Sequence, residues 1–160
     1  LSDTNFRKIL LDVARAQGKK IHIPSGAIMG LDNLKVGCIS RIDSVLLRTT
    51  KSPESLGMQV SHRTLAFRGK ANECIKQFPK NINVSVALSL AVHHDVDVEL
   101  WADPDVDRNI HDIFVSGEFG EASIRVVNHP SPDNPATSYL AALSVLSLLK
   151  NLDSPLVIGS

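Results

Sequence analysis

The chain has 160 residues, of which 43% are hydrophobic and 21% are charged, the balance of an ordinary globular domain. This composition excludes extended disorder. Lysine plus arginine and aspartate plus glutamate both total 17, so the chain lacks the basic excess that is typical of nucleic-acid binders.

The sequence contains no apolar run of the roughly 18 residues that a membrane-spanning helix needs. Its two cysteines, Cys38 and Cys74, lie far apart, and they form neither a disulfide framework nor a zinc-binding pattern. This cysteine usage fits a reducing compartment, so we expect the protein to be cytoplasmic.

The first segment has the pattern of an amphipathic helix. Ser2 or Asp3 can cap its start, Gly18 stands where a left-handed C-terminal cap is expected, and four apolar residues recur at helical spacing: Phe6, Ile9, Leu10 and Val13. A short strand over residues 21–24 is predicted next. A helix and a strand with no strand before them resemble the end of a βα repeat, so we expect residues 1–24 to end a domain whose start is missing. The alternative is a natural N-terminus that has lost only its methionine.

The middle of the chain alternates short strands and helices. After a turn at residues 25–30, the predicted elements are a helix over residues 31–36 that Gly37 ends, a strand over 45–50, a loop at 51–55, a strand over 65–68 closed by Gly69, and a helix over 71–77. Residues 84–92 are apolar nearly all round, which fits either a buried helix or a core strand. We favour the helix, because Asn81 and Asn83 can cap its start.

The last third begins with a strand and ends with a helix. Residues 95–100 alternate as in a half-buried strand, and Gly117-Glu118-Phe119-Gly120 between two apolar runs predicts a hairpin. An extended, Pro-rich loop over residues 129–135 leads to an amphipathic helix over residues 139–149, with leucines 140, 143 and 146 on one face. The order of elements predicts an α+β fold: a mixed or antiparallel sheet with helices packed on one face.

Two segments are candidates for chemistry on their pattern alone. His111 follows a polar loop, and a neutral imidazole there can act as a general acid or base near pH 7. Ser25-Gly26-Ala27 joins a predicted strand to a predicted helix, and such a turn offers backbone N–H groups to an anion or a carboxamide. Both have plainer interpretations, since a lone histidine is more often structural and many such turns hold glycine for backbone reasons only.

Further polar residues allow a binding role or a purely structural one. Lys80 and Asn83 stand at the entry to the apolar helix, where Lys80 can attract a carboxylate and Asn83 can be a simple cap. The adjacent His93 and His94 point apart on any regular element, so we predict no metal site there. Three cations stand near strand ends, where most such side chains are solvated: Arg48, Lys51 and Arg63.

Five separated blocks of the sequence resemble the L-aspartate dehydrogenases, in the right order and over nearly the whole chain. The blocks are Ser25 to Asp32, Phe78 to Val84, Ala102-Asp103 with Asn109-Ile110-His111, Gly117 to Glu121, and Asn134-Pro135 with Thr137 to Ser144. The resemblance implies a two-domain enzyme that interconverts L-aspartate and oxaloacetate plus ammonia, through iminoaspartate, with NAD or NADP. It implies that an N-terminal Rossmann domain binds the cofactor and that a C-terminal α+β domain supplies the active site and the subunit contact of a homodimer.

The same resemblance divides the chain and suggests roles. Residues 1–24 would be the last helix and strand of the Rossmann domain, residues 25–150 the catalytic and dimerisation domain, and residues 151–160 a C-terminal tail. His111 matches the active-site histidine. Ala27 and Asn83 match positions that contact the nicotinamide cofactor, with Ser25 and Gly26 beside them, and Lys80 and Lys51 are the cations available for the two substrate carboxylates.

Further expectations follow from the family, and two alternatives remain open. Relatives supply aspartate or iminoaspartate for NAD biosynthesis, and this chain without a complete Rossmann domain should be inactive. One alternative is a related two-domain reductase such as dihydrodipicolinate reductase, whose His-His pair resembles His93-His94. In that family a lysine and a Ser-Gly-Thr loop follow the pair, whereas Asp95-Val96-Asp97 follows it here. The other is a domain that serves oligomerisation and has no enzymatic activity.

Overall fold

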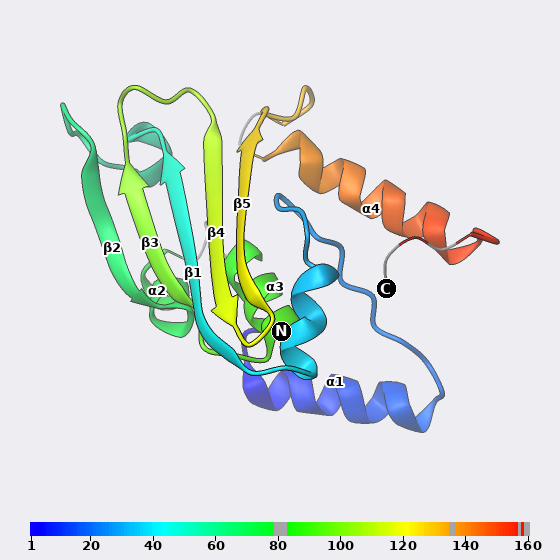
Figure 1. Ribbon diagram of the computed structural model, residues 1–160. Helices are drawn as coiled ribbons and strands as arrows, with labels where there is room; N and C mark the ends of the chain where they lie inside the picture. Colours follow the sequence, from blue (N-terminus) through cyan, green and yellow to red (C-terminus); the bar gives the residue numbers. More distant parts are fainter. Residues whose placement is uncertain (79–82, 135–136, 157, 159–160) are drawn as a thin grey trace.

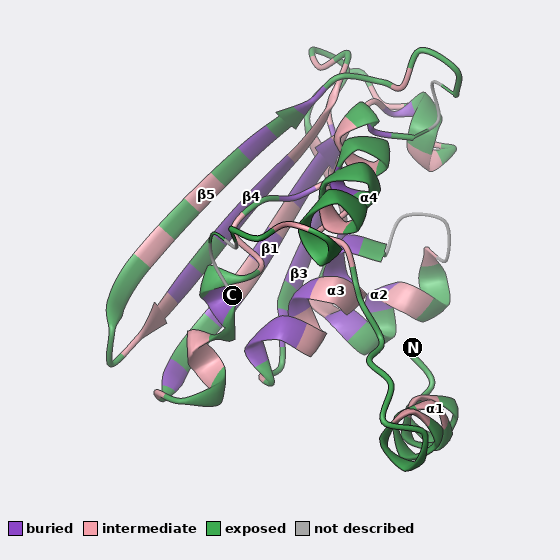
Figure 2. Ribbon diagram, turned by 90° about the vertical axis from the view of Figure 1, so that its right-hand side faces the viewer, coloured by how far each residue is buried: buried purple, intermediate pink, exposed green. Residues whose placement is uncertain are grey.

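The computed structural model describes residues 1–78, 83–134, 137–156 and 158, and it has one mixed sheet at its centre (Figure 1). The elements are α1 (Thr4–Ala16), η1 (Asn33–Cys38), β1 (Ile42–Lys51), η2 (Glu54–Leu56), β2 (Thr64–Lys70), α2 (Ala71–Gln77), α3 (Asn83–Val92), β3 (Asp97–Ala102), β4 (Asn109–Gly117), β5 (Gly120–Asn128) and α4 (Tyr139–Leu152). Figure 2 shows the α-helices on one side of the sheet. The predicted α+β fold is therefore confirmed.

The five strands run in the order β2-β3-β1-β4-β5. The central strand β1 is parallel to β3 and antiparallel to β4, and the outer strands β2 and β5 are antiparallel to their neighbours. The predicted hairpin is confirmed: β4 and β5 pair along their length around Glu118-Phe119. Because β1 lies between β3 and β4, side chains at its carboxyl end lie beside the start of β4.

The core lies between the sheet and the helices on one face. Residues 84–92 form α3, as we predicted, and Val84, Leu88 and Val92 of this helix are buried. They belong to one cluster with sheet residues such as Leu100 and Ile113. A short apolar helix can be buried on several sides at once, which explains why its sequence has little amphipathic pattern.

Residues 31–38 differ from the prediction. The 3₁₀ helix η1 begins only at Asn33, and Gly37 lies inside this helix instead of ending it. A Cβ at Gly37 would lie 2.4 Å from Cδ1 of Ile42 and 2.7 Å from the carbonyl oxygen of Val92. Glycine is therefore needed here because the backbone packs closely against α3 and β1.

The N-terminal helix is confirmed, but its apolar stripe does not join the core. Asp3 caps α1 through its carboxylate, which accepts a hydrogen bond from the amide of Phe6 at 2.8 Å. No residue of α1 is buried, and the side chains of Phe6 and Ile9 are 53% and 60% exposed. Residues 21–24 do not form the predicted strand, because no described strand lies beside them to accept their hydrogen bonds.

The C-terminal helix α4, like α1, forms as predicted but leaves apolar side chains exposed. Its predicted existence is confirmed, yet Leu143 and Leu146 are 40% and 56% exposed, and Ser144 is its only described buried residue. The apolar face that we expected to pack on the core thus lies largely in solvent. In the described parts of the chain, no helix is long and apolar enough to cross a membrane.

Candidate active site

A cavity of about 400 Å³ lies where the end of β1, the start of β4, the N-terminus of α3 and helix α4 approach one another. The segment 23–27 crosses beside it. Six residues that we singled out from the sequence line this cavity: Ser25, Gly26, Ala27, Lys51, Asn83 and His111. The seventh, Lys80, lies outside the described residues. The fold therefore brings together side chains that are up to 86 positions apart, from Ser25 to His111.

His111 is held in the sheet by its neighbour across the strands. Thr49 of β1 is directly opposite His111 of β4, and both side chains are only 4% exposed. The Thr49 hydroxyl and the His111 Nδ1 atom are 2.9 Å apart and form a hydrogen bond. One ring nitrogen is thereby occupied, so Nε2 is the nitrogen left for a ligand in the cavity.

Lys51 makes the cavity electropositive. Burial lowers the pKa of the Lys51 ammonium from its ordinary value. Burial, and secondly the positive charge of Lys51, lower the pKa of His111 to about 4. At neutral pH, the imidazole is therefore uncharged beside a cation, an arrangement that favours an anionic ligand.

The turn at Ser25-Gly26-Ala27 is fixed from two sides. The amide of Gly26 donates a hydrogen bond to the hydroxyl of Ser144 on α4 at 3.0 Å. The side-chain amide of Asn128 at the end of β5 donates to the carbonyl of Ala27 at 2.9 Å. The N–H group of Gly26 is therefore occupied by Ser144 in this structure, and the ligand contacts expected of this turn stay a prediction.

Three polar residues at this site were not predicted from the sequence: Thr49, Ser144 and Asn128. Thr49 and Lys51 are two positions apart on β1, so period-2 alternation places them on one face, and this signal was available. Ser144 is a small polar residue in an apolar helix, which hints at a close polar contact. Asn128 has no comparable signal, because its partner Ala27 is 101 positions away.

The other cations near strand ends lie elsewhere. Arg48 and Arg68 both form ion pairs with Glu99, at 2.8 and 3.0 Å, and Arg63 lies 3.8 Å from Asp103. None of these arginines lines the cavity of His111. Among the described residues, no group of three His, Cys, Asp or Glu side chains could hold a metal ion.

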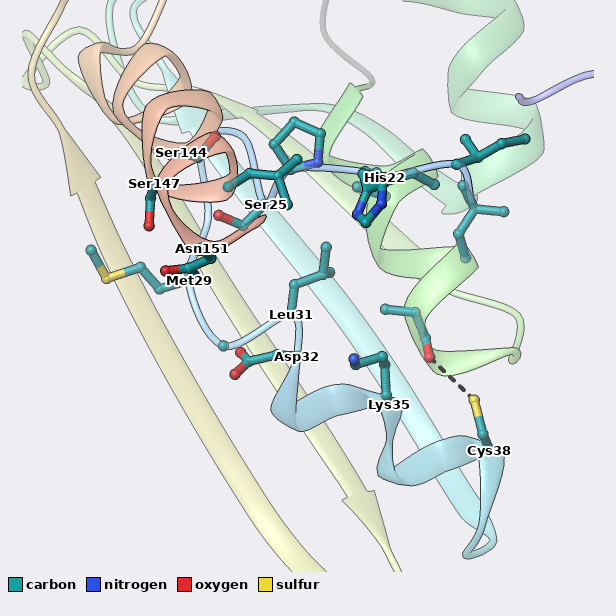
Figure 3. Close-up of a pocket in the computed structure, with 18 of the residues that line it drawn as sticks. His22, Ser25, Met29, Leu31, Asp32, Lys35, Cys38, Ser144, Ser147 and Asn151 are labelled. Atoms are coloured by element: carbon teal, nitrogen blue, oxygen red, sulfur yellow. Dashed lines mark hydrogen bonds between the residues drawn. The ribbon is translucent and has the colours of Figure 1, made fainter. Parts of the chain in front are cut away.

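A second cavity of about 580 Å³ adjoins the first along residues 23–25 (Figure 3). Asp32 and Lys35 of the η1 region and Ser144 and Asn151 of α4 line the second cavity, and Ser25 lines both. Only the first cavity is lined by Lys51 and His111.

Comparison with known proteins decides the family. The family model described as "Aspartate dehydrogenase, C-terminal" matches residues 32–152. The chain belongs to the aspartate dehydrogenase family. It is 97% identical, over all of its 160 residues, to an L-aspartate dehydrogenase of Methanospirillum hungatei and covers 64% of that protein. It is 47% identical to an L-aspartate dehydrogenase of Methanothermobacter thermautotrophicus, again over the whole chain and 62% of the relative.

A solved structure of this family has the same fold. The crystal structure of aspartate dehydrogenase from Thermotoga maritima superimposes with a TM-score of 0.85 at 33% sequence identity. The match covers 99% of this chain and 64% of that one. The chain therefore spans somewhat less than two thirds of the length of these aspartate dehydrogenases.

Proposed function

We propose that this chain is the catalytic part of an NAD- or NADP-dependent enzyme that interconverts L-aspartate and oxaloacetate plus ammonia. The observation that carries the proposal is the cavity in which Lys51 and a buried, neutral His111 lie together. Family membership supports the same reaction, since the relatives above are L-aspartate dehydrogenases.

In this proposal, Lys51 binds a carboxylate of the substrate. A charge-assisted hydrogen bond from a half-buried ammonium contributes about 1.5–3 kcal/mol. The bound carboxylate would also offset the positive charge that acts on His111. The pKa of the imidazole would then rise toward its ordinary value, so that it can exchange a proton near neutral pH.

His111 is assigned the proton transfers. In the reductive direction, ammonia adds to the carbonyl carbon of oxaloacetate, and the resulting carbinolamine must lose water to form iminoaspartate. His111 donates a proton to the departing hydroxyl. In the oxidative direction, the same imidazole takes a proton from the water that attacks the imine carbon.

The residues of the cavity fit the nicotinamide end of NAD or NADP, which supplies or accepts the hydride when it is bound. Val84, Ala87 and Val145 give the cavity an apolar wall against which a flat ring can lie. Asn83 brings a side-chain amide that can pair with the carboxamide, and the turn at Ala27 lies beside it. These residues would hold the ring, while Lys51 and His111 remain for the substrate.

We also propose that residues 1–24 belong to a Rossmann-type domain, residues 25–150 to the catalytic and dimerisation domain, and residues 151–160 to a tail. The exposed apolar faces of α1 and α4 support this division, because they need a partner, and the relatives are longer than this chain. The 160 residues by themselves should then bind NADH weakly and show no turnover. Fluorescence titration tests this, and micromolar affinity for NADH would contradict it.

A homodimer is proposed through the open face of the sheet. No described helix covers this face, on which Leu46 and Phe114 are cross-strand partners. Its charges are largely paired within one copy, as in Arg48–Glu99 and Arg125–Asp112. Phe114→Asp should therefore convert the full-length protein to a monomer in sedimentation experiments, and an unchanged dimer would locate the contact elsewhere.

The two free cysteines, Cys38 and Cys74, support a cytoplasmic location, and the reaction supports a role in NAD biosynthesis.

The direct test of the proposed activity is an assay with the full-length protein. Oxidation of NADH or NADPH that requires both oxaloacetate and ammonia would support it. Turnover of dihydrodipicolinate instead would favour the related reductase. No turnover of either compound would favour a domain that serves only oligomerisation.

A further inference from the structure

We propose that Thr49 is a positioning residue of the active site, which holds the His111 ring by its Nδ1 atom so that Nε2 exchanges protons with the substrate. This inference rests on the proposed function of His111. The two residues are cross-strand partners on β1 and β4, so their side chains leave the sheet on the same face. Their contact is therefore fixed by strand register.

The contact is dry and short. The hydroxyl oxygen of Thr49 and Nδ1 of His111 are 2.9 Å apart, and each residue is 4% exposed. Water has little access to this nitrogen, so loss of the Thr49 hydroxyl would leave a buried polar atom without its partner. The ring would then lose the contact that selects its orientation.

A hydroxyl suits this role chemically, because it can both donate and accept a hydrogen bond. In the protonated ring both nitrogens carry protons: Nδ1 donates to the Thr49 oxygen, and Nε2 holds the proton that goes to the substrate. Once Nε2 has given up that proton, the neutral ring keeps the proton on Nδ1, so the hydrogen bond to Thr49 is unchanged and Nε2 can accept a proton again. In the other neutral tautomer the Thr49 hydroxyl rotates and donates to Nδ1, and in none of these states does it place a second charge beside Lys51.

The neighbouring residue supplies a matched control. Thr50 is also 4% exposed and lies on the same strand, but it is paired with Ile110 and points to the opposite face. Thr49→Val and Thr50→Val remove the same hydroxyl from equally buried positions. Only the first change removes a hydrogen bond to His111.

The experiment compares Thr49→Val, Thr49→Ser, Thr50→Val, His111→Ala and the double variant Thr49→Val with His111→Ala, all in the full-length enzyme. We expect Thr49→Val to lower kcat roughly tenfold with little change in the KM for NADH, which corresponds to the loss of one hydrogen bond in the transition state. Thr49→Ser should retain most of kcat, and Thr50→Val nearly all of it. The double variant should be no slower than His111→Ala, because Thr49 acts only through the imidazole.

Several results would overturn the proposal. A Thr49→Ser variant as slow as Thr49→Val would show that the methyl group matters and the hydroxyl does not. A double variant that is slower than His111→Ala would show that Thr49 acts independently of the ring. If Thr49→Val does not fold, Thr49→Ala and Thr49→Ser provide the same comparison. If His111→Ala itself retains full kcat, the proposed role of His111 fails. If His111→Ala has a low kcat but Thr49→Val has a normal one, only the proposed role of Thr49 is rejected.

Discussion

Lys51 and His111 line one cavity from neighbouring antiparallel strands, and the charge of Lys51 adds to burial in lowering the pKa of His111 to about 4. At neutral pH the imidazole of the empty site is therefore uncharged, and the cation opposes its protonation. In the proposed function, the same cation attracts a dicarboxylate, whose negative charge offsets that opposition. Substrate binding and protonation of His111 would then be coupled.

The first prediction concerns stability at acid pH. Between pH 6.5 and 4, the imidazole of the unfolded chain is protonated while that of folded His111 is not, so the unfolded state binds more protons. The contribution of His111 to the free energy of unfolding is complete above pH 6.5. It decreases by about 3 kcal/mol in total as the pH falls toward 4. Urea unfolding of the wild-type protein and His111→Asn at several pH values measures this difference. Parallel stability curves for the two proteins would contradict the burial of an uncharged His111.

The second prediction concerns Lys51. Lys51→Met should raise the KM for oxaloacetate about 10- to 100-fold, because about 1.5–3 kcal/mol of binding to a carboxylate is lost. It should also raise the pKa of His111 in the empty site, because a repelling charge is removed. Steady-state kinetics and NMR titration of the imidazole measure the two effects.

Lys76→Met is the control for this experiment. Lys76 is exposed in the last turn of α2 and does not line the cavity, so its replacement should leave the KM for oxaloacetate and the pKa of His111 unchanged. If Lys51→Met behaves like Lys76→Met, Lys51 does not contact the substrate.

The third prediction concerns the turn at Ser25-Gly26-Ala27, beside which we propose that the cofactor binds. Ser144→Ala removes the hydroxyl that accepts a hydrogen bond from Gly26, so the turn at Ala27 should lose its fixed position. The KM for NADH should rise by up to about tenfold, the value of one hydrogen bond. Ser147→Ala, on the same helix and exposed, should have no effect. Equal kinetics for the two variants would show that the Gly26–Ser144 contact does not support cofactor binding.

Local signals predicted much of this fold. The helix over residues 71–77 begins and ends where we expected, because a strand ends at Lys70 and Pro79 follows. The hairpin around Glu118-Phe119 was equally readable, since its two strands are adjacent in sequence. Such elements depend on residues close to one another along the chain.

The errors arose where structure depends on distant partners. The alternating Ile21-His22-Ile23 resembles a strand, but a strand exists only beside another, and the described residues provide none. The helices α1 and α4 were predicted correctly, yet sequence periodicity reveals only that a helix has an apolar face and not what covers it.

In the candidate site, too, features that depend on nearby residues were predictable and contacts between distant residues were not. His111 and Asn83 were candidates from their place in the sequence, and a family resemblance suggested their roles. Lys51 was one of several similar cations, and the fold separates it from Arg48 and Arg63. Strand alternation could have placed Thr49 beside Lys51, but its contact with His111 depends on strand register between positions 62 residues apart, which the sequence does not reveal.

The kinetics of His111→Ala in the full-length enzyme test the central claim most directly. A positioned general acid–base group contributes about 10²- to 10⁴-fold, so kcat should fall by that factor, while the dissociation constant of the cofactor changes less than about threefold. His111→Asn should recover little activity, because an amide can form hydrogen bonds but cannot exchange the proton. A His111→Ala protein that folds normally and retains near-normal kcat would contradict the account.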